Sequence, residues 1–215
     1  WLRRGHAVPQ AVIAESAWAR DAVRALAQRA ERVARLPDAL FDGLSALESP
    51  SGVGFVVPLP AQAAIEPASP TVVLDRVQDA GNVGSILRSA AAMGFTQVLA
   101  IEGTAGLWSP KVLRAAMGAH FGLRLAEGLS IDGLSPLALP LLATSSHAGA
   151  SLADAVLPWP CGWIFGHEGQ GVDATLMARC RATLCIPQPG GEESLNVAAA
   201  AAICLHESQR QRQRR

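Results

Sequence analysis

The chain has 215 residues, half of them hydrophobic, which is enough for one domain of moderate size and a smaller companion. Its 18 basic and 18 acidic residues balance, so net charge neither indicates nor excludes a nucleic-acid partner. No apolar run is long enough to span a bilayer and no signal peptide is found, so we expect a cytoplasmic protein that has no membrane partner.

Residues 1–60 predict a small, incomplete α/β domain. We expect strands at 8–14 and 52–59, a helix at 18–35 and a short helix at 37–47. The 18–35 segment carries five arginines, which are more often a solvated helix face than a phosphate-contacting one. Residues 61–70, rich in proline and alanine, have the composition of a linker.

Residues 71–215 alternate between strands and helices. The predicted strands are 71–74, 97–101, 121–125, 139–144, 162–165 and 184–186, and the predicted helices are 85–93, 110–117, 151–155, 173–180 and one from 194. This order predicts a mostly parallel sheet with helices on both faces. Ligands of such sheets bind beyond the carboxyl ends of the strands, where three glycine-bearing loops should meet.

The four cysteines show no metal-binding or disulfide pattern. Cys161, Cys180, Cys185 and Cys204 lack any CxxC spacing and stand among apolar neighbours. We therefore expect buried free thiols in a reducing compartment and predict no metal site.

The first loop, LDRVQDAGNVGSILRSAAAMGF, spans residues 74–95. Its glycines and Asn82 form a polar turn that leads into a helix carrying Arg88 among apolar residues. Because an unpaired charge is costly to bury, Arg88 should have an anionic partner. That partner is either a ligand or, as a structural salt bridge, Glu168.

The second loop, IFGHEGQGV, spans residues 164–172 and has the glycine order G-x-x-G-x-G. This is not the G-x-G-x-x-G of dinucleotide folds, and no GxxxxGK[ST] loop occurs, so NAD and ATP are poorly supported. Glu168 either holds the loop together or contacts substrate. We interpret His167 as a loop residue rather than a catalytic base.

The third loop, CIPQPGGEESLNVAAAAAICL, spans residues 185–205. A glycine turn leads to Ser194 and Asn196, residue types that favour helix starts. The exposed helix N-terminus would suit an anionic or carbonyl-bearing ligand. Taken alone, such a loop is usually an ordinary strand-to-helix connection.

Together the segments DAGNVGSILRSA, FGHEGQG and IPQPGGEESLNVAAAAAI resemble the three signature motifs of the SpoU (TrmH-type) RNA ribose 2′-O-methyltransferases, in the SPOUT superfamily. The resemblance covers residues 71–208, and residues 1–60 resemble the later part of an L30e-like substrate-binding domain. It implies a methyltransferase domain at 71–215 with a C-terminal trefoil knot. It also implies S-adenosylmethionine as cofactor and RNA as substrate.

The resemblance also implies roles for individual residues. The cofactor would be held by the backbone of Gly166, Ile186 and Leu195, with Thr144 near the adenine. The family is dimeric, and Arg88 matches an arginine that works beside the cofactor of the other subunit. The remaining motif positions match Asn82, Glu168, Ser194 and Asn196.

The family proposal makes that arginine a general base. Because guanidinium is effectively always protonated, we instead expect Arg88 to orient the 2′-hydroxyl and stabilise developing negative charge. The chain departs from the usual family pattern at Ala80, Ala116 and Ala198, which are not proposed catalytic positions. The basic tail, 209–215, is either a solubilising end or an RNA contact that follows the active-site helix.

Three functions compete at this point. We favour an S-adenosylmethionine-dependent RNA 2′-O-methyltransferase, acting on ribosomal RNA in preference to transfer RNA. The second is a non-catalytic RNA-binding protein of the same fold. The third is an unrelated doubly wound enzyme that uses a nucleotide cofactor, against which the missing phosphate-loop patterns argue.

Overall fold

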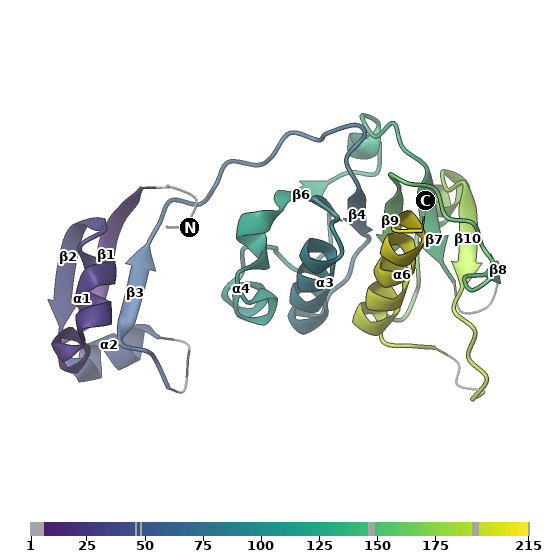
Figure 1. Cartoon of the computed structure of the whole chain (residues 1–215). Helices are drawn as coiled ribbons and strands as arrows, with labels where there is room; N and C mark the ends of the chain where they lie inside the picture. Colours follow the sequence, from purple (N-terminus) through teal and green to yellow (C-terminus); the bar gives the residue numbers. More distant parts are fainter. Residues whose placement is uncertain (1–6, 46, 48, 146–148, 191–193, 215) are drawn as a thin grey trace. The chain divides into compact units, whose positions relative to one another are not determined.

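The computed structural model describes residues 7–214, except 46, 48, 146–148 and 191–193 (Figure 1). The chain divides into two compact units, residues 1–60 and 61–215. Among the described residues, no helix combines the length and the apolar character needed to cross a membrane.

The first unit is a three-stranded sheet with order β2-β1-β3. Strand β1 (Val8–Ala14) pairs in parallel with β2 (Ala30–Leu36) and antiparallel with β3 (Val53–Val56). A 3₁₀ turn, η2 (Ser16–Ala19), and two short helices, α1 (Asp21–Ala27) and α2 (Asp38–Leu44), complete the unit.

The predicted helix at 18–35 is wrong. It divides into the end of η2, α1 and most of β2, which is hydrogen-bonded along β1 from Ala30 to Leu36. Arg32 and Arg35 are exposed on this edge strand, whose other residues are exposed or half-buried. Spaced arginines are compatible with an exposed strand as well as with a helix. Here the hydrogen bonds with β1 favour the strand.

The second unit contains a seven-stranded sheet. The strands are β4 (Thr71–Leu74), β5 (Gln97–Ile101), β6 (Arg124–Leu129), β7 (Leu141–Thr144), β8 (Ala150–Ser151), β9 (Gly162–Phe165) and β10 (Ala182–Cys185). Their order is β6-β5-β4-β9-β7-β10-β8, and the pairings between them are parallel. The predicted mostly parallel sheet is therefore confirmed.

Both faces of this sheet are covered, as predicted, but unevenly. Helices α3 (Ala80–Ala92), α4 (Pro110–Ala116) and α6 (Val197–Arg212) share one core with the sheet and lie side by side in Figure 1. The other face packs against α5 (Ala174–Ala178) and the 3₁₀ turn η4 (Asp132–Leu134). Another 3₁₀ turn, η3 (Ala119–Gly122), follows α4.

Alternating side chains of β4 serve the two cores. Val72 and Leu74 face the three-helix layer, and Val73 faces the other layer. All four residues of this strand are buried, as expected for an interior strand, and β4 lies next to the central strand β9. The first loop, which leads into α3, follows directly from the carboxyl end of this strand.

Two helices begin at other residues than predicted, and one predicted helix is wrong. Helix α3 begins at Ala80, five residues earlier than expected, because the Asp79 side chain caps it by accepting a hydrogen bond from the Asn82 N–H at 2.7 Å. Helix α6 begins at Val197, because Asn196 and not Ser194 is its N-cap. The expected helix at 151–155 is wrong, since this segment starts with the end of strand β8 and continues as a turn.

The far end of α6 is fixed to the sheet. The buried Trp163 indole donates to Ser208 Oγ at 2.9 Å, and the Gln211 side chain accepts from Leu157 N and donates to Ala155 O. Sixteen residues make α6 about 24 Å long. Gln209, the first residue of the tail, therefore lies about 20 Å along the helix from Asn196, and contact of the tail with RNA stays a prediction.

The four cysteines are free, as predicted. Cys161 and Cys204 are buried, whereas Cys180 and Cys185 are only half-buried. Burial raises the pKa of the Cys161 thiol to about 12, although a hydrogen bond with Ser208 opposes this rise. Cys161 is therefore protonated and unreactive at neutral pH.

Candidate active site

A cavity of about 610 Å³ lies beyond the carboxyl ends of β7, β9 and β10. Its volume falls within the range of about 300–1,000 Å³ that is usual for small-molecule sites. The sequence-predicted cofactor residues all line it: Thr144, Gly166, Ile186 and Leu195. They meet because β9, β7 and β10 are neighbours in the sheet, although their loops are far apart in the chain.

The cavity wall mixes apolar and polar groups. Val172, Met177, Ile186 and Leu195 provide apolar surface, and polar side chains and glycine backbone lie between them. Ser194 also lines the cavity, but it does not cap α6. The part of the third loop at 191–193 lies outside the described residues.

One polar network joins the three motifs at the edge of this cavity. The Asn82 side chain donates to Glu168 Oε1 at 3.1 Å and accepts from Asn196 Nδ2 at 3.0 Å. Asn196 meanwhile caps α6 by accepting from the N–H groups of Ala198 and Ala199. Three of the five predicted catalytic residues are thus in direct contact.

Glu168 fixes the second loop to the start of α3. Its carboxylate accepts from the backbone N–H groups of Gln78 and Asp79, each at 3.2 Å, as well as from Asn82. Partial burial raises the pKa of Glu168, but the hydrogen bonds from Asn82 and from backbone N–H groups outweigh it and lower that pKa below its usual value. Of the two roles expected, the structure supports holding the loop.

The second loop folds back on itself. His167 and Gly171 exchange two backbone hydrogen bonds, and His167 Nδ1 accepts from Gly169 N at 2.9 Å and Gln170 N at 3.2 Å. A Cβ atom on Gly166 would lie 2.2 Å from the Gly171 carbonyl carbon, so no side chain fits there. His167 is a loop residue, as predicted, because its ring nitrogen is engaged in shaping the turn.

Arg88 lies apart from this network. Six residues beyond Asn82 on α3, it is about 9 Å further along the helix and turned by about 240°. It is exposed, it does not line the cavity, and its guanidinium has no hydrogen bond or ion pair within the part of the chain that the structure describes. Of the two alternatives, the structural salt bridge with Glu168 is therefore wrong, because Asn82 and two backbone groups occupy that carboxylate.

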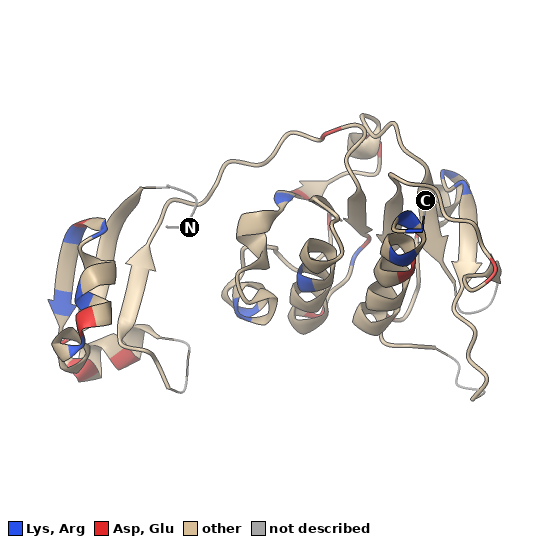
Figure 2. Cartoon of the chain, viewed as in Figure 1, with Lys and Arg blue, Asp and Glu red and all other residues tan. Residues whose placement is uncertain are grey.

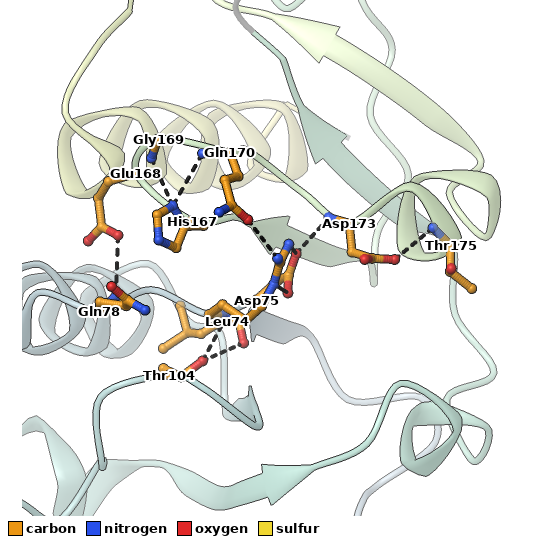
Figure 3. Close-up of polar contacts among 11 residues, drawn as sticks. Leu74, Asp75, Gln78, Thr104, His167, Glu168, Gly169, Gln170, Asp173 and Thr175 are labelled. Atoms are coloured by element: carbon orange, nitrogen blue, oxygen red, sulfur yellow. Dashed lines mark hydrogen bonds and ion pairs between the residues drawn. The ribbon is translucent and has the colours of Figure 1, made fainter.

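Sequence reasoning missed an ion pair between buried Asp75 and half-buried Arg76, beside the cavity. Asp75 is 1% exposed and accepts from Arg76 Nε at 2.8 Å and from the Asp173 N–H at 2.7 Å (Figure 3). This bond with Asp75 raises the pKa of Arg76 above its usual value, although partial burial lowers it. A carboxylate directly after a fully buried strand was the signal that could have indicated it.

Comparison with known proteins identifies the family. Residues 69–206 match the family model described as the SpoU rRNA Methylase family. The chain belongs to the SpoU family. This SpoU protein is 32% identical to the 23S rRNA (guanosine(2553)-2′-O)-methyltransferase RlmP of Bacillus subtilis, over 80% of this chain and 70% of the relative.

Two further matches extend across both units of the SpoU chain. The 23S rRNA (uridine(2479)-2′-O)-methyltransferase of Streptomyces viridochromogenes is 30% identical over 92% of this chain and 72% of the relative. The crystal structure of the SpoU methyltransferase AviRb from the same organism, in complex with AdoMet, aligns with a TM-score of 0.87. It is 26% identical and covers 99% of this chain and 86% of that one.

Proposed function

We propose that this SpoU protein transfers the methyl group of S-adenosylmethionine to a ribose 2′-hydroxyl of RNA. The observation that carries the proposal is the meeting of three distant motifs, through Asn82, Glu168 and Asn196, at the edge of one cavity. Membership of the family and the names of the relatives support the same reaction.

The cavity fits the chemistry of S-adenosylmethionine. The cofactor has an apolar adenine, a ribose diol and a charged amino-acid end, and the wall offers both apolar side chains and polar backbone. The tight fold at Gly166 brings loop backbone to the cavity surface. When bound, the cofactor supplies a methyl group carried on a sulfonium.

We assign the protein residues to alignment rather than to proton abstraction. Asn82, Glu168 and Asn196 hold the second loop and the starts of α3 and α6 in fixed relation. Such alignment of donor and acceptor is a major part of what an enzyme adds to a displacement reaction. Ser194 lies at the cavity wall, where its hydroxyl can bind the cofactor or the incoming ribose.

We assign Arg88 to the cavity of a second copy of the chain. Its guanidinium is exposed, has no partner among the described residues and does not line its own cavity, so it is available to a neighbouring subunit. There it would orient the 2′-hydroxyl, hold the adjacent phosphate and stabilise developing charge. This assignment requires a homodimer.

Ribosomal RNA is the favoured substrate. The relatives that align over most of the chain are named for 23S rRNA. Transfer RNA is the alternative, since a structure titled for 2-OH methylation of C/U34 on tRNA is 32% identical over 70% of this chain, with a TM-score of 0.62. The L30e-like identity of residues 1–60, the knot and the cytoplasmic location stay predictions.

Two measurements test the function. Calorimetric titration with S-adenosylmethionine should show saturable binding, and incubation with rRNA and tRNA transcripts should add ribose methyl groups to one of them. Binding of RNA without any binding of S-adenosylmethionine would favour the non-catalytic alternative.

A subunit-mixing experiment tests the homodimer. Arg88→Ala and Gly166→Val chains should each be inactive alone. When equal amounts of the two chains assemble at random, about half of the dimers are mixed, and each mixed dimer keeps one of its two sites intact. About a quarter of the unmodified activity should therefore return. No restoration in verified mixed dimers would show that Arg88 acts within its own subunit.

A further inference from the structure

Asp75 and Arg76 follow strand β4 and have no part in the function proposed so far. The Asp75 carboxylate accepts from Arg76 Nε at 2.8 Å and from the other guanidinium arm, Nη2, at 3.1 Å. Side-chain exposure is 1% for Asp75 and 31% for Arg76. A planar, two-point contact of this kind fixes the direction of the guanidinium as well as its position.

The other hydrogen bonds of the two side chains end on the second loop or its exit. The Asp173 N–H, where the loop enters α5, donates to Asp75 Oδ2 at 2.7 Å. Arg76 Nη1 donates to Gln170 Oε1 at 3.1 Å, and Gln170 lines the cavity. Figure 3 shows Asp75 between Gln170 on one side and Asp173 on the other.

The backbone of Arg76 is held in an unfavourable conformation. Its φ is +58°, in the left-handed region, which costs a residue with a side chain roughly 1–2 kcal/mol. Thr104 supports this geometry, because its hydroxyl accepts from Arg76 N and donates to Leu74 O, each at 3.0 Å. A strained residue held on several sides and placed beside a ligand cavity indicates a functional constraint.

We propose that Asp75 and Arg76 are positioning residues that set the shape of the cofactor cavity through the second loop. The inference rests on the proposed function and deepens it. Glu168 ties the loop to α3, whereas Asp75 ties its far end to β4, and Arg76 holds the Gln170 side chain in the cavity wall. Hydrogen bonds therefore hold both ends of the second loop in place before any ligand binds.

Calorimetric titration of the full chain with S-adenosylmethionine tests this role. Asp75→Asn replaces one acceptor oxygen with a donor, so it cannot satisfy both Arg76 and Asp173, and we expect the cofactor Kd to rise about tenfold or more. Gln170→Ala removes only the outer contact and should raise Kd about threefold. Asp132→Asn, which breaks the exposed pair with Arg179, is the matched control and should leave Kd unchanged.

A double-mutant cycle tests the connection itself. If Arg76 acts through Gln170, adding Gln170→Ala to Arg76→Ala should cost less than Gln170→Ala costs in the unmodified chain. Arg76→Lys keeps the charge but not the two-point contact, so it should recover only part of the affinity. Full recovery by lysine would mean that charge alone matters and would overturn the geometric role.

The titration separates positioning from folding. A purely structural role would lower the number of sites per chain and leave Kd unchanged, which overturns the inference. Because Gln170 is exposed, its variant remains informative even if Asp75→Asn does not fold. Absence of cofactor binding by the unmodified chain would overturn the proposed function and this inference together, whereas equal Kd values in folded variants overturn the inference alone.

Discussion

The two ends of helix α3 differ sharply in how fully their polar groups are engaged. At its start, Asp79, Asn82 and Glu168 are joined by short hydrogen bonds to each other and to the backbone. Two turns later, Arg88 extends from the same helix with no partner among the described residues. The polar groups at the start of the helix are therefore engaged within one chain, whereas the Arg88 guanidinium has no partner in the described part of it.

This difference separates the two halves of the proposed reaction. The cofactor side is organised in advance by contacts within one chain, which lowers the cost of ordering it during the reaction. In the proposed function, the acceptor side is completed by a second subunit and an RNA. Figure 2 marks basic residues on both α3 and α4, and neither helix contains Asp or Glu.

The largest expected effect is on methyl transfer alone. Arg88→Ala should lower kcat by about 10²–10³-fold, because it removes charge stabilisation at the acceptor, and should leave the Kd of S-adenosylmethionine unchanged. Single-turnover kinetics at saturating cofactor, together with calorimetry, measure the two quantities. Arg179→Ala, at a surface ion pair, is the control. An equal loss of cofactor affinity in the Arg88 variant would contradict the claim that the two ends of α3 serve different parts of the reaction.

The next effect is on cofactor binding. Gly166→Ala places a Cβ atom 2.2 Å from the Gly171 carbonyl carbon, so the loop has to move and the cofactor Kd should rise about a hundredfold. Gly43→Ala, where nothing lies within 4 Å of the added atom, should not change it. Normal affinity in the Gly166 variant would mean that the loop does not form the cofactor wall.

A smaller effect is expected at the junction of the motifs. Asn82→Ala removes its hydrogen bonds with Glu168 and Asn196, and should lower the free energy of unfolding by about 1–3 kcal/mol. Chemical denaturation measures this change. Ser85→Ala, at an exposed position one turn further along the same helix, serves as the control and should change stability much less. Equal losses in both variants would mean that the junction adds nothing specific.

The smallest effect concerns pH. The pKa of Glu168 is lower in the folded chain than its ordinary value of 4.5, so its contribution to stability is present above that pH and is lost as the pH falls through the folded-state pKa. Glu168→Gln should therefore reduce the acid dependence of thermal unfolding. The same acid slope in both proteins would show that other carboxylates account for it.

Much of the second unit was predictable because its signals are local. Continuous apolar runs gave strands β4, β5 and β9 with their observed bounds, and glycine loops located the sheet edge where the cavity lies. The family resemblance, rather than any local pattern, indicated Thr144, Gly166, Ile186 and Leu195 as cofactor residues, and all four line one cavity in the structure.

The remaining features depend on contacts between distant parts of the chain. The later part of the segment at 18–35 becomes a strand because it pairs with β1. Glu168 is not available to Arg88 because its carboxylate accepts from the N–H groups of Gln78 and Asp79, just before α3. The Asp75–Asp173 contact joins residues 98 positions apart. Sequence spacing cannot reveal which of several charges in a loop turns inward, because that depends on the packing of the neighbouring strand.

Because Asn196 both caps α6 and joins the motif network, the cavity is completed late in synthesis. The residues that line the cavity occur along the chain from Thr144, through the glycine loop, to Ala200. Helix α6 carries the last of them, and its hydrogen bonds to the rest of the domain are made by Ser208 and Gln211. Chains are made from the N-terminus at about 5–20 residues per second. A nascent polypeptide still lacking this helix therefore has no finished pocket, and cofactor capture begins only after translation has passed it.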